Sequence, residues 1–310
     1  MNEVYHIPAM LHETIEGLNI KPDGTYVDVT FGGGGHSRAM IACLRDGGRL
    51  YSFDQDSDAL RNAIDDLRWT FVHSNFRYLH NWMDYYGVDY IDGLLADLGV
   101  SFHHFDCPER GFSFRFSAPL DMRMNQTAKR TAADIVNTYS EEELARIFWL
   151  YGELKNGRGI AKNICRARAQ RAIERTEDLV KVAYPHPLPE RMGAEIEVPT
   201  QYKKDLARLF QALRIEVNDE MGALREMLVA ARDLLKPGGR IAILTYHSLE
   251  DRLVKNFLRS GNLEGTIEKD FYGNNLSPFT LIEKGREATE EEVAFNPRAR
   301  SAKLRIAEKR

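Results

Sequence analysis

The sequence predicts an α/β protein in which a parallel sheet is interrupted by an inserted helical segment. Short apolar runs alternate with helical periodicity over the first hundred residues; the alternation stops at about residue 107 and resumes near residue 218. Strict alternation of strand and helix is typical of crossover units in a parallel sheet. The length of 310 residues also exceeds what one core usually supports. We therefore expect one α/β domain formed by residues 1–106 and 201–310, with a helical domain of residues 107–200 inserted into it.

The elements of the α/β domain follow from its apolar patterns, taken in chain order. Each expected strand is a short run rich in β-branched or aromatic residues, and each expected helix repeats apolar residues at helical spacing. Before the insertion, strands are expected over residues 26–30, 49–54, 70–73 and 91–97, and helices over residues 35–45 and 57–66. After it, we expect a helix over residues 218–235, a strand over residues 240–246, and short segments at 265–269, 279–283 and 303–307 that could complete the sheet.

The inserted domain is expected to be helical, because residues 107–198 contain no convincing buried strand. An irregular stretch over residues 108–125 comes first. Apolar residues then recur at the spacing of one helix face over residues 140–150 and 159–175.

The composition excludes several classes of protein. Apolar residues make up 43% and charged residues 28% of the chain, which excludes a disordered or fibrous protein. The net charge of −4 does not mark a nucleic-acid binder, so any basic surface must be local. The cysteines Cys43, Cys107 and Cys165 lie too far apart to indicate a zinc site or a disulfide framework. No signal segment or bilayer-spanning apolar run is found, so we expect a cytoplasmic protein without a membrane partner.

A glycine-rich loop follows the first expected strand. Four consecutive glycines, Gly32 to Gly35, let the backbone approach a ligand closely beside the N-terminus of the next helix. The loop predicts a nucleotide-like ligand, with a flexible turn as the alternative. It is not a good dinucleotide fingerprint, because Ser37 or Arg38 stands where the third glycine is needed.

Acidic residues end three of the expected strands, at Asp28, Asp54 and Asp97. Asp54 lies about 20 residues beyond the glycines, where doubly wound folds place an acid that binds ribose hydroxyls. Asp97 lies at the carboxyl edge of the sheet, where open α/β sheets bind ligands. One pocket explains the three acids better than three unrelated turns. Carboxylates suit a sulfonium and an ammonium better than a pyrophosphate, which favours S-adenosylmethionine over NAD.

Histidines occur in two segments of interest. Ser248 with Asp251 resembles a capping box at the start of a helix. His247 falls at the same sheet edge as the acids and is either a catalytic residue or a hydrogen-bonded structural residue. The run from His103 to Cys107 does not predict a metal site, because side chains so close in sequence rarely converge on one ion.

A local basic segment lies in the insertion. Between residues 155 and 175, seven Lys or Arg residues accompany the single acid Glu174, and a second basic excess lies over residues 298–310. Basic segments beside a cofactor pocket suit a polyanionic substrate such as RNA, whereas a solvated helix face is the alternative. The residues expected to bind RNA are Lys162, Arg166, Arg168 and Arg171.

Taken together, these motifs resemble the bacterial 16S rRNA cytosine-N4 methyltransferases of the RsmH (MraW) type. The matching segments follow the family order over nearly the whole chain, which is far more specific than any one of them. They are His6 to Glu13, Thr30 to Ser37, Asp97 to Ser101, Arg110 to Phe114, Pro119 to Met124, Phe210 to Asn218, His247 to Arg252 and Asn296 to Ser301.

The resemblance implies a class I S-adenosylmethionine-dependent methyltransferase (Rossmann-like) fold whose helical insertion recognises the substrate. It also implies methylation of N4 of a decoding-region cytidine in 16S rRNA of the small ribosomal subunit. His104 stands where the family usually has a glutamine that contacts the cofactor. The cofactor positions that carry over are Gly34, Gly35, His36, Asp54, Phe76 and Asp97, together with His104.

Methylation of the cytosine amine needs a group that accepts hydrogen bonds from N4 as its proton is lost. Asp97 is the first candidate and His247 the alternative. Phe112, Phe114 and Tyr246 are either stacking partners for a splayed base or core residues. The rival hypotheses are a small-molecule methyltransferase on the same fold and a non-catalytic RNA-binding assembly protein. The sequence leaves the oligomeric state open, a homodimer included.

Overall fold

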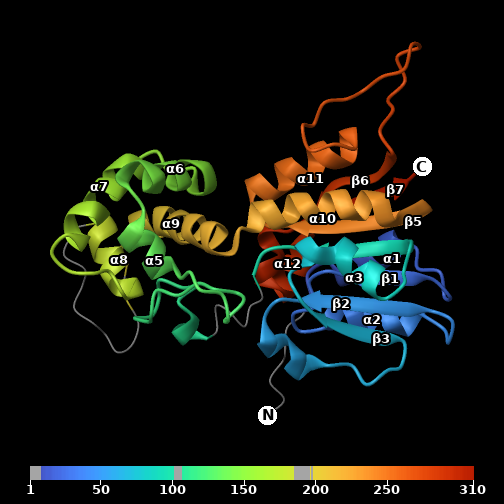
Figure 1. Cartoon of the computed structure of the whole chain (residues 1–310), viewed down its shortest axis with the longest axis horizontal. Helices are drawn as coiled ribbons and strands as arrows, with labels where there is room; N and C mark the ends of the chain where they lie inside the picture. Colours follow the sequence, from blue (N-terminus) through green and yellow to red (C-terminus); the bar gives the residue numbers. More distant parts are fainter. Residues whose placement is uncertain (1–7, 101–106, 185–195, 197) are drawn as a thin grey trace. The chain divides into compact units, whose positions relative to one another are not determined.

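The computed structural model describes residues 8–100, 107–184, 196 and 198–310, and the chain divides into two compact units (Figure 1). The α/β unit comprises Met1–Gly99 and Met221–Arg310, and the helical unit comprises Val100–Glu220. The expected fold class, an α/β protein with an inserted helical segment, is therefore confirmed. The helical unit is longer than the expected 107–200, because it extends to Val100 at one end and to Glu220 at the other.

A seven-stranded sheet forms the centre of the α/β unit, with the strand order β3-β2-β1-β4-β5-β7-β6. The five strands β1 to β5 run parallel, and β7 is antiparallel to both of its neighbours. The strand order reverses direction between β1 and β4, and such a switch point is where open α/β sheets bind ligands. The strands are β1 (Thr25–Asp28), β2 (Arg49–Asp54), β3 (Trp69–His73), β4 (Ile91–Asp97), β5 (Leu235–Thr245), β6 (Phe279–Glu287) and β7 (Lys303–Lys309).

Helices flank the sheet of this unit, and none in the described ranges is long and apolar enough to cross a membrane. The α-helices are α1 (Leu11–Leu18), α2 (Gly35–Cys43), α3 (Leu79–Tyr85), α10 (Glu220–Leu234), α11 (Ser248–Ser260) and α12 (Glu290–Phe295). The 3₁₀-helices are η1 (Ser57–Asn62), η2 (Phe76–Tyr78) and η4 (Pro297–Ser301).

One apolar core fixes α1 and α2 against the sheet. Tyr26, Leu95 and Leu244 come from three neighbouring strands and are all buried in this core. They pack with Leu18 of α1 and Met40 of α2. Burial of each such side chain contributes about 1.5–3 kcal/mol, so this core holds the loop between β1 and α2 in a defined place at the switch point.

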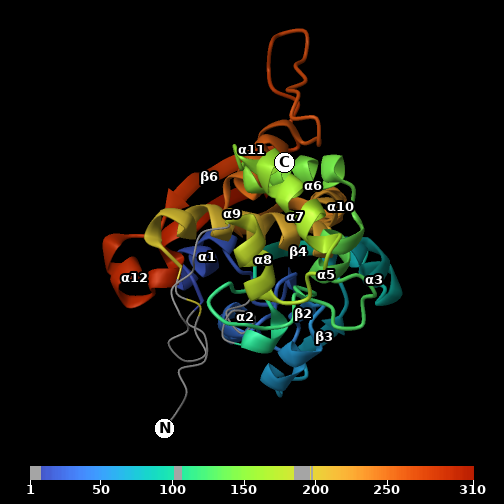
Figure 2. The ribbon, with the colours of Figure 1, turned by 90° about the vertical axis from the view of Figure 1, so that its left-hand side faces the viewer.

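The segment between α11 and β6 projects from the α/β unit in both views (Figures 1 and 2). Residues 265–269 were expected to complete the sheet, and this prediction is wrong, because Lys269 forms an isolated bridge with Asn275. The Asp270 carboxylate accepts hydrogen bonds from the backbone N–H groups of Tyr272 and Asn274 at 2.9 and 2.8 Å. This turn reverses the chain and gives the segment a local partner instead of a sheet strand.

The helical unit has its own apolar core. Two of its helices begin with complete capping boxes, formed by Thr131 with Asp134 and by Ser140 with Glu143, and caps of this kind stabilise a helix start by about 1 kcal/mol. Its elements are η3 (Pro108–Arg110), α5 (Ala132–Thr138), α6 (Glu141–Gly152), α7 (Gly157–Arg168), α8 (Thr176–Ala183) and α9 (Thr200–Asn218).

The helix α9 belongs to the helical unit, although the sequence division placed residues 201–310 in the α/β domain. Leu206, Leu209 and Leu213 of α9 are fully buried in the core of the helical unit. Asp219 then adopts a left-handed conformation, with φ 47°, and separates α9 from α10. The expected helix over 218–235 is therefore α10, and the boundary between the units lies at this break.

Candidate active site

The carboxyl ends of β1, β2 and β4 bring three acids to one edge of the sheet, as the sequence predicted. Asp28 lies opposite Ser52 of β2 and Leu95 of β4 in register, so the three strands end close together. Asp28 itself is fully buried. Its Oδ2 accepts a hydrogen bond from Ser37 Oγ at 2.6 Å, and its Oδ1 accepts one from the backbone N–H of Thr30 at 3.0 Å. Asp28 therefore fixes the two ends of the glycine loop.

The glycine loop is held in a defined conformation by backbone contacts. Its Gly32 N–H donates to Asp54 Oδ2 at 2.8 Å, and Asn62 Nδ2 donates to the Gly32 carbonyl at 3.0 Å. Gly32 and Gly34 have φ values of +49° and +75°, in the left-handed region that favours glycine. A Cβ on Gly32 would meet no atom within 4 Å, so one side of the loop is open to a ligand.

Asp54 occupies the end of β2 and binds the glycine loop through one carboxylate oxygen and the turn after β2 through the other. Oδ2 accepts from Gly32 as described, and Oδ1 accepts from the backbone N–H of Asp56 at 2.8 Å. A carboxylate at this position is the kind of group that accepts hydrogen bonds from ribose hydroxyls. Phe76 lies just beyond the end of the neighbouring strand β3 and is half-buried.

Asp97 ends β4 and is held by three neighbouring elements. Its backbone N–H donates to Thr30 Oγ1 at 2.6 Å, and its Oδ1 accepts from the Tyr246 hydroxyl at 2.7 Å. Its Oδ2 lies 3.7 Å from His36 Nδ1. Burial raises the pKa of Asp97 to about 7; the Tyr246 hydrogen bond opposes this rise and the Glu250 charge adds to it. This carboxyl therefore changes charge near neutral pH.

His36 in the first turn of α2 is buried, with 5% of its side chain exposed. Its Nε2 lies 3.2 Å from the carbonyl oxygen of Ala9, which makes Nε2–H the donor and leaves Nδ1 as the acceptor facing Asp97. Burial lowers the pKa of His36, so the imidazole is neutral. His36 thus joins the residues around Asp97 without bringing a positive charge.

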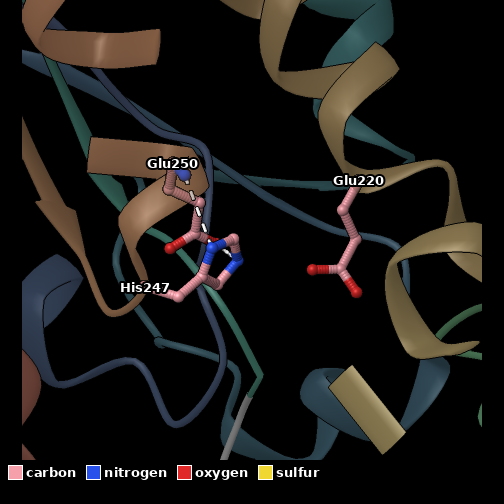
Figure 3. Close-up of side chains that lie close together, drawn as sticks. All are labelled: Glu220, His247 and Glu250. Atoms are coloured by element: carbon pink, nitrogen blue, oxygen red, sulfur yellow. Dashed lines mark hydrogen bonds and ion pairs between the residues drawn. The ribbon is translucent and has the colours of Figure 1, made fainter. Parts of the chain in front are cut away.

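His247 is the N-cap residue of α11, one position earlier than the expected cap at Ser248. The Glu250 N–H donates to His247 Nδ1 at 3.4 Å, and His247 Nε2 lies 3.1 Å from Glu250 Oε1 (Figure 3). Asp251, expected to complete a cap with Ser248, instead binds Arg305 at 2.7 Å. The capping-box prediction was therefore off by one residue, because an imidazole nitrogen can accept the N–H three residues ahead.

Several sequence predictions fall elsewhere. Residues 101–106, and with them His104, lie outside the described residues. Phe112 is buried in the core of the helical unit, and Phe114 packs edge-on against Phe210 with ring centroids 5.6 Å apart. Both belong to a core, which was one of the two interpretations of these residues. Tyr246 is half-buried, and its hydroxyl is committed to Asp97.

The basic residues of the helical unit divide into two kinds. Lys162 and Arg166 are exposed on one face of α7, together with Arg158, and Arg171 is exposed beyond its end. The opposite face of α7 carries the buried residues Ile160, Ala161 and Ile164. Arg168 differs, because its Nη1 donates to the Val136 carbonyl at 2.7 Å and the residue is half-buried. The Arg168 guanidinium thus stabilises the fold of the helical unit, whereas Lys162, Arg166 and Arg171 have side chains exposed to solvent.

The C-terminal basic excess is also partly engaged within the fold. Arg305 is 7% exposed and binds Asp251, and Lys309 Nζ donates to the Arg232 carbonyl at 2.6 Å. A count of charges along the chain cannot separate such residues from exposed ones. The exposed cations of α7 are the stronger candidates for a polyanion-binding surface.

The sequence did not predict the contact between Tyr246 and Asp97, which organises this site. Tyr246 directly follows β5, the strand that pairs with β4, and Asp97 lies opposite Leu244 in register. The pairing of these two strands would have placed the tyrosine beside the aspartate. Pairing of the two strands could not be derived from the sequence across the insertion, so the tyrosine was weighed as a stacking residue.

The chain is similar to known proteins over nearly its whole length. Residues 3–310 match the model of the MraW methylase family. The Ribosomal RNA small subunit methyltransferase H of Parabacteroides distasonis is 59% identical over 307 residues, which cover 98% of this chain and 97% of the relative. Its counterpart from Phocaeicola vulgatus is 58% identical over 309 residues, which cover 99% of this chain and 98% of the relative.

A solved structure described as a putative rRNA-methylase from Clostridium thermocellum is similar with a TM-score of 0.44 and 13% identity, over 98% of this chain and 100% of that chain. The sequence matches are far closer and span nearly the full length of both partners. The chain belongs to the MraW methylase family.

Proposed function

We propose that this chain is an S-adenosylmethionine-dependent methyltransferase that acts on the exocyclic N4 of a decoding-region cytidine in 16S rRNA. The relatives are named as methyltransferases of small-subunit ribosomal RNA. The observation that carries the proposal is the position of Asp97 at the switch-point edge, where the Tyr246 hydroxyl donates to its Oδ1 at 2.7 Å and its Oδ2 faces His36. Burial raises the pKa of this carboxyl to about 7. A base of this kind matches the proton that the cytosine amine must lose.

The residues at the sheet edge fit S-adenosylmethionine. Gly32 leaves open space on one side of the loop, which allows close approach of a ligand to the backbone. Asp54 ends β2, where doubly wound folds place the acid that binds ribose hydroxyls, and Phe76 lies at the end of the next strand, where it can pack on a base. Gly34 is the N-cap residue of α2, and Gly35 and His36 form the first turn of that helix, on the same loop. Three carboxylates at this edge suit a cationic ligand and disfavour a pyrophosphate.

When bound, S-adenosylmethionine supplies a methyl group activated by its sulfonium. The cytosine amine is a weak nucleophile, because its lone pair is delocalised into the ring. Asp97 accepts a hydrogen bond from N4–H through the carboxylate oxygen that faces His36, so electron density rises on nitrogen as the proton departs. His247 caps α11 through Nδ1, which accepts from the Glu250 N–H. We prefer Asp97 for this role because it ends β4 at the switch-point edge.

The exposed cations of α7 provide a surface for the RNA backbone. Arg158, Lys162 and Arg166 follow one another at four-residue intervals and share one helix face. Contacts of this kind bind phosphates and orient the substrate without reading its sequence. A small-molecule methyltransferase has no need of such a face, which favours an RNA substrate. We place the enzyme in the cytoplasm, where ribosomal subunits are assembled.

The proposal is tested by mass spectrometry of 16S rRNA nucleosides from cells with and without the gene. We expect cytidine methylated at N4 to disappear from the deletion strain and to return when the parent gene is restored. Purified protein should methylate small subunits from the deletion strain. Unchanged nucleosides, together with transfer of labelled methyl groups to small molecules, would establish the small-molecule alternative. Absence of S-adenosylmethionine binding would establish a non-catalytic assembly protein.

Replacing Asp54 by alanine is expected to weaken cofactor binding by about 1.5–3 kcal/mol, because a charge-assisted hydrogen bond to the ribose is lost. Isothermal titration calorimetry with S-adenosylmethionine measures the change. The matched control is Asp58→Ala, which removes a half-buried acid of the first turn of η1 that pairs with Arg61. Unchanged affinity in Asp54→Ala would remove this residue from the binding site.

A further inference from the structure

We propose that Tyr246 is a positioning residue for Asp97, whose hydrogen bond to one carboxylate oxygen leaves the other oxygen to take the N4 proton. The inference rests on the proposed function, because it assigns a role in the same reaction. Nothing in the family match or in the names of the relatives concerns this tyrosine.

The tyrosine is held in place from three sides. Its backbone N–H donates to Glu250 Oε2 at 3.0 Å, and its ring packs into the core shared with α1 and α2. The ring also faces Gly99, where an added Cβ would lie 3.4 Å from Tyr246 Cδ2. Gly99 has φ +99° and so has a conformation that glycine favours. A hydroxyl fixed in this way is preorganised for one acceptor.

That acceptor is Oδ1 of Asp97, at 2.7 Å. The other oxygen, Oδ2, faces His36 Nδ1 at 3.7 Å. Because His36 directs its Nε2 proton to the Ala9 carbonyl, Nδ1 has a lone pair and does not compete for Oδ2 as a donor. The hydrogen bond from Tyr246 therefore occupies one oxygen and directs proton uptake to the other.

Charge around Asp97 makes the tyrosine necessary. Burial and the Glu250 charge both raise the pKa of Asp97, and the Tyr246 hydrogen bond lowers it. The net result of the three effects is a pKa of about 7. Neutral His36 supplies no positive charge to offset them. The titratable groups that face the pair from the surrounding elements are Asp28 of β1, His36 of α2, Glu250 of α11 and Glu292 of α12, with His247 capping α11. Without the hydroxyl, the pKa of the carboxyl would rise further, so less of it would be ionised at neutral pH and able to take the N4 proton.

The N4 lone pair forms the new N–C bond to the methyl carbon, and the S–C bond pair stays on sulfur as the sulfonium becomes a thioether. The N4 proton passes to Oδ2 of Asp97. The positive charge of the sulfonium and the negative charge of the carboxylate are thus removed together, and the proton then leaves to solvent.

The test is the pH profile of Tyr246→Phe in single-turnover methyl transfer to small ribosomal subunits at saturating S-adenosylmethionine. Loss of one charge-assisted hydrogen bond corresponds to roughly one to two pKa units. We expect the acidic limb to move to higher pH by that amount, with the rate recovering toward the parent value above the new limb. Cofactor affinity should change less than about twofold. The matched control is Tyr26→Phe, which removes a buried tyrosine hydroxyl that accepts from Lys21 N–H at 2.7 Å.

A limb at the parent position in Tyr246→Phe, or an equal loss of rate at every pH, would overturn the inference. A second measurement needs no substrate. Titration of the Asp97 carboxyl carbon by NMR in the apoprotein should give a higher pKa in Tyr246→Phe than in the parent and in Tyr26→Phe. If the parent fails to methylate rRNA while this titration shifts as expected, the proposed function fails, and what stands is that Tyr246 lowers the pKa of Asp97. An unshifted titration overturns the inference whatever the substrate.

Discussion

Asp97→Asn is expected to slow single-turnover methyl transfer by at least about 100-fold at saturating cofactor, the usual scale of general-base catalysis. Asparagine keeps the acceptor for the Tyr246 hydroxyl and places an N–H donor toward His36 Nδ1, so both contacts of Asp97 survive. It cannot take the N4 proton. Rapid-quench assays on small ribosomal subunits measure the rate, and calorimetry measures cofactor affinity, which we expect to change far less. Equal losses in rate and affinity would make Asp97 a cofactor ligand, and His247→Ala would be tested next.

Thermal unfolding of the same variant provides the control for folding. The pKa of Asp97 is about 7 in the folded protein and near 3.8 when unfolded, so the folded state binds the extra proton between these values. Stability from this group is therefore fully present below pH 3.8 and is lost as the pH rises through 7. Asp97→Asn removes the titration, and we expect a higher Tm than the parent at pH 8.5, by roughly 2–4 °C for each kcal/mol recovered. A lower Tm at that pH would indicate a folding defect.

Reversing the exposed charges of the helical unit is expected to weaken binding to small-subunit RNA and to flatten its salt dependence. In the triple variant Lys162→Glu, Arg166→Glu, Arg171→Glu, each lost phosphate contact should reduce the slope of log affinity against log salt by roughly one unit. Filter binding across a salt series measures the slope. Cofactor affinity should be unaffected, because the glycine loop and its acids belong to the α/β unit.

Two controls separate phosphate binding from general electrostatics. Lys203→Glu with Lys204→Glu changes exposed lysines on α9 and leaves the α7 face intact. Arg168 is left unchanged, because its bond to the Val136 carbonyl supports the fold. If the triple variant and the α9 variant give the same slope as the parent, the α7 face is merely solvated.

Local patterns predicted the strands well and the tertiary context poorly. The strands 49–54 and 91–97 were predicted at their observed bounds, because a short apolar run between two turns is too short for a helix and is typical of a buried strand. The expected helix over 57–66 is instead the 3₁₀-helix η1, ended at Ala63. The helix α9 was not anticipated, since its buried leucines face a core assembled from residues far away in the sequence.

In the candidate site, too, features set by local sequence were predicted and contacts between distant segments were not. The glycine loop and the acids at Asp54 and Asp97 could be read from the sequence, because their meaning depends only on following a parallel strand. Tyr246 could not be assigned in this way, as its partner is 149 residues away. Arg168 was predicted to bind RNA, and a sequence does not show that its Nη1 donates to the Val136 carbonyl.

The insertion between β4 and β5 has a consequence for synthesis of the chain. Leu94 of β4 pairs with Ile241 of β5, and the whole helical unit is translated between these two strands. Translation of that unit takes on the order of 10 s, and for this time β4 lacks one of its two neighbouring strands. During that time a strand that is almost entirely buried in the finished protein presents an unpaired edge, which is a site for aggregation. Asp92 and Asp97 are the only charges in β4. The aspartate that we propose as the proton acceptor is thus also one of the two charges that this edge presents to solvent before β5 is made.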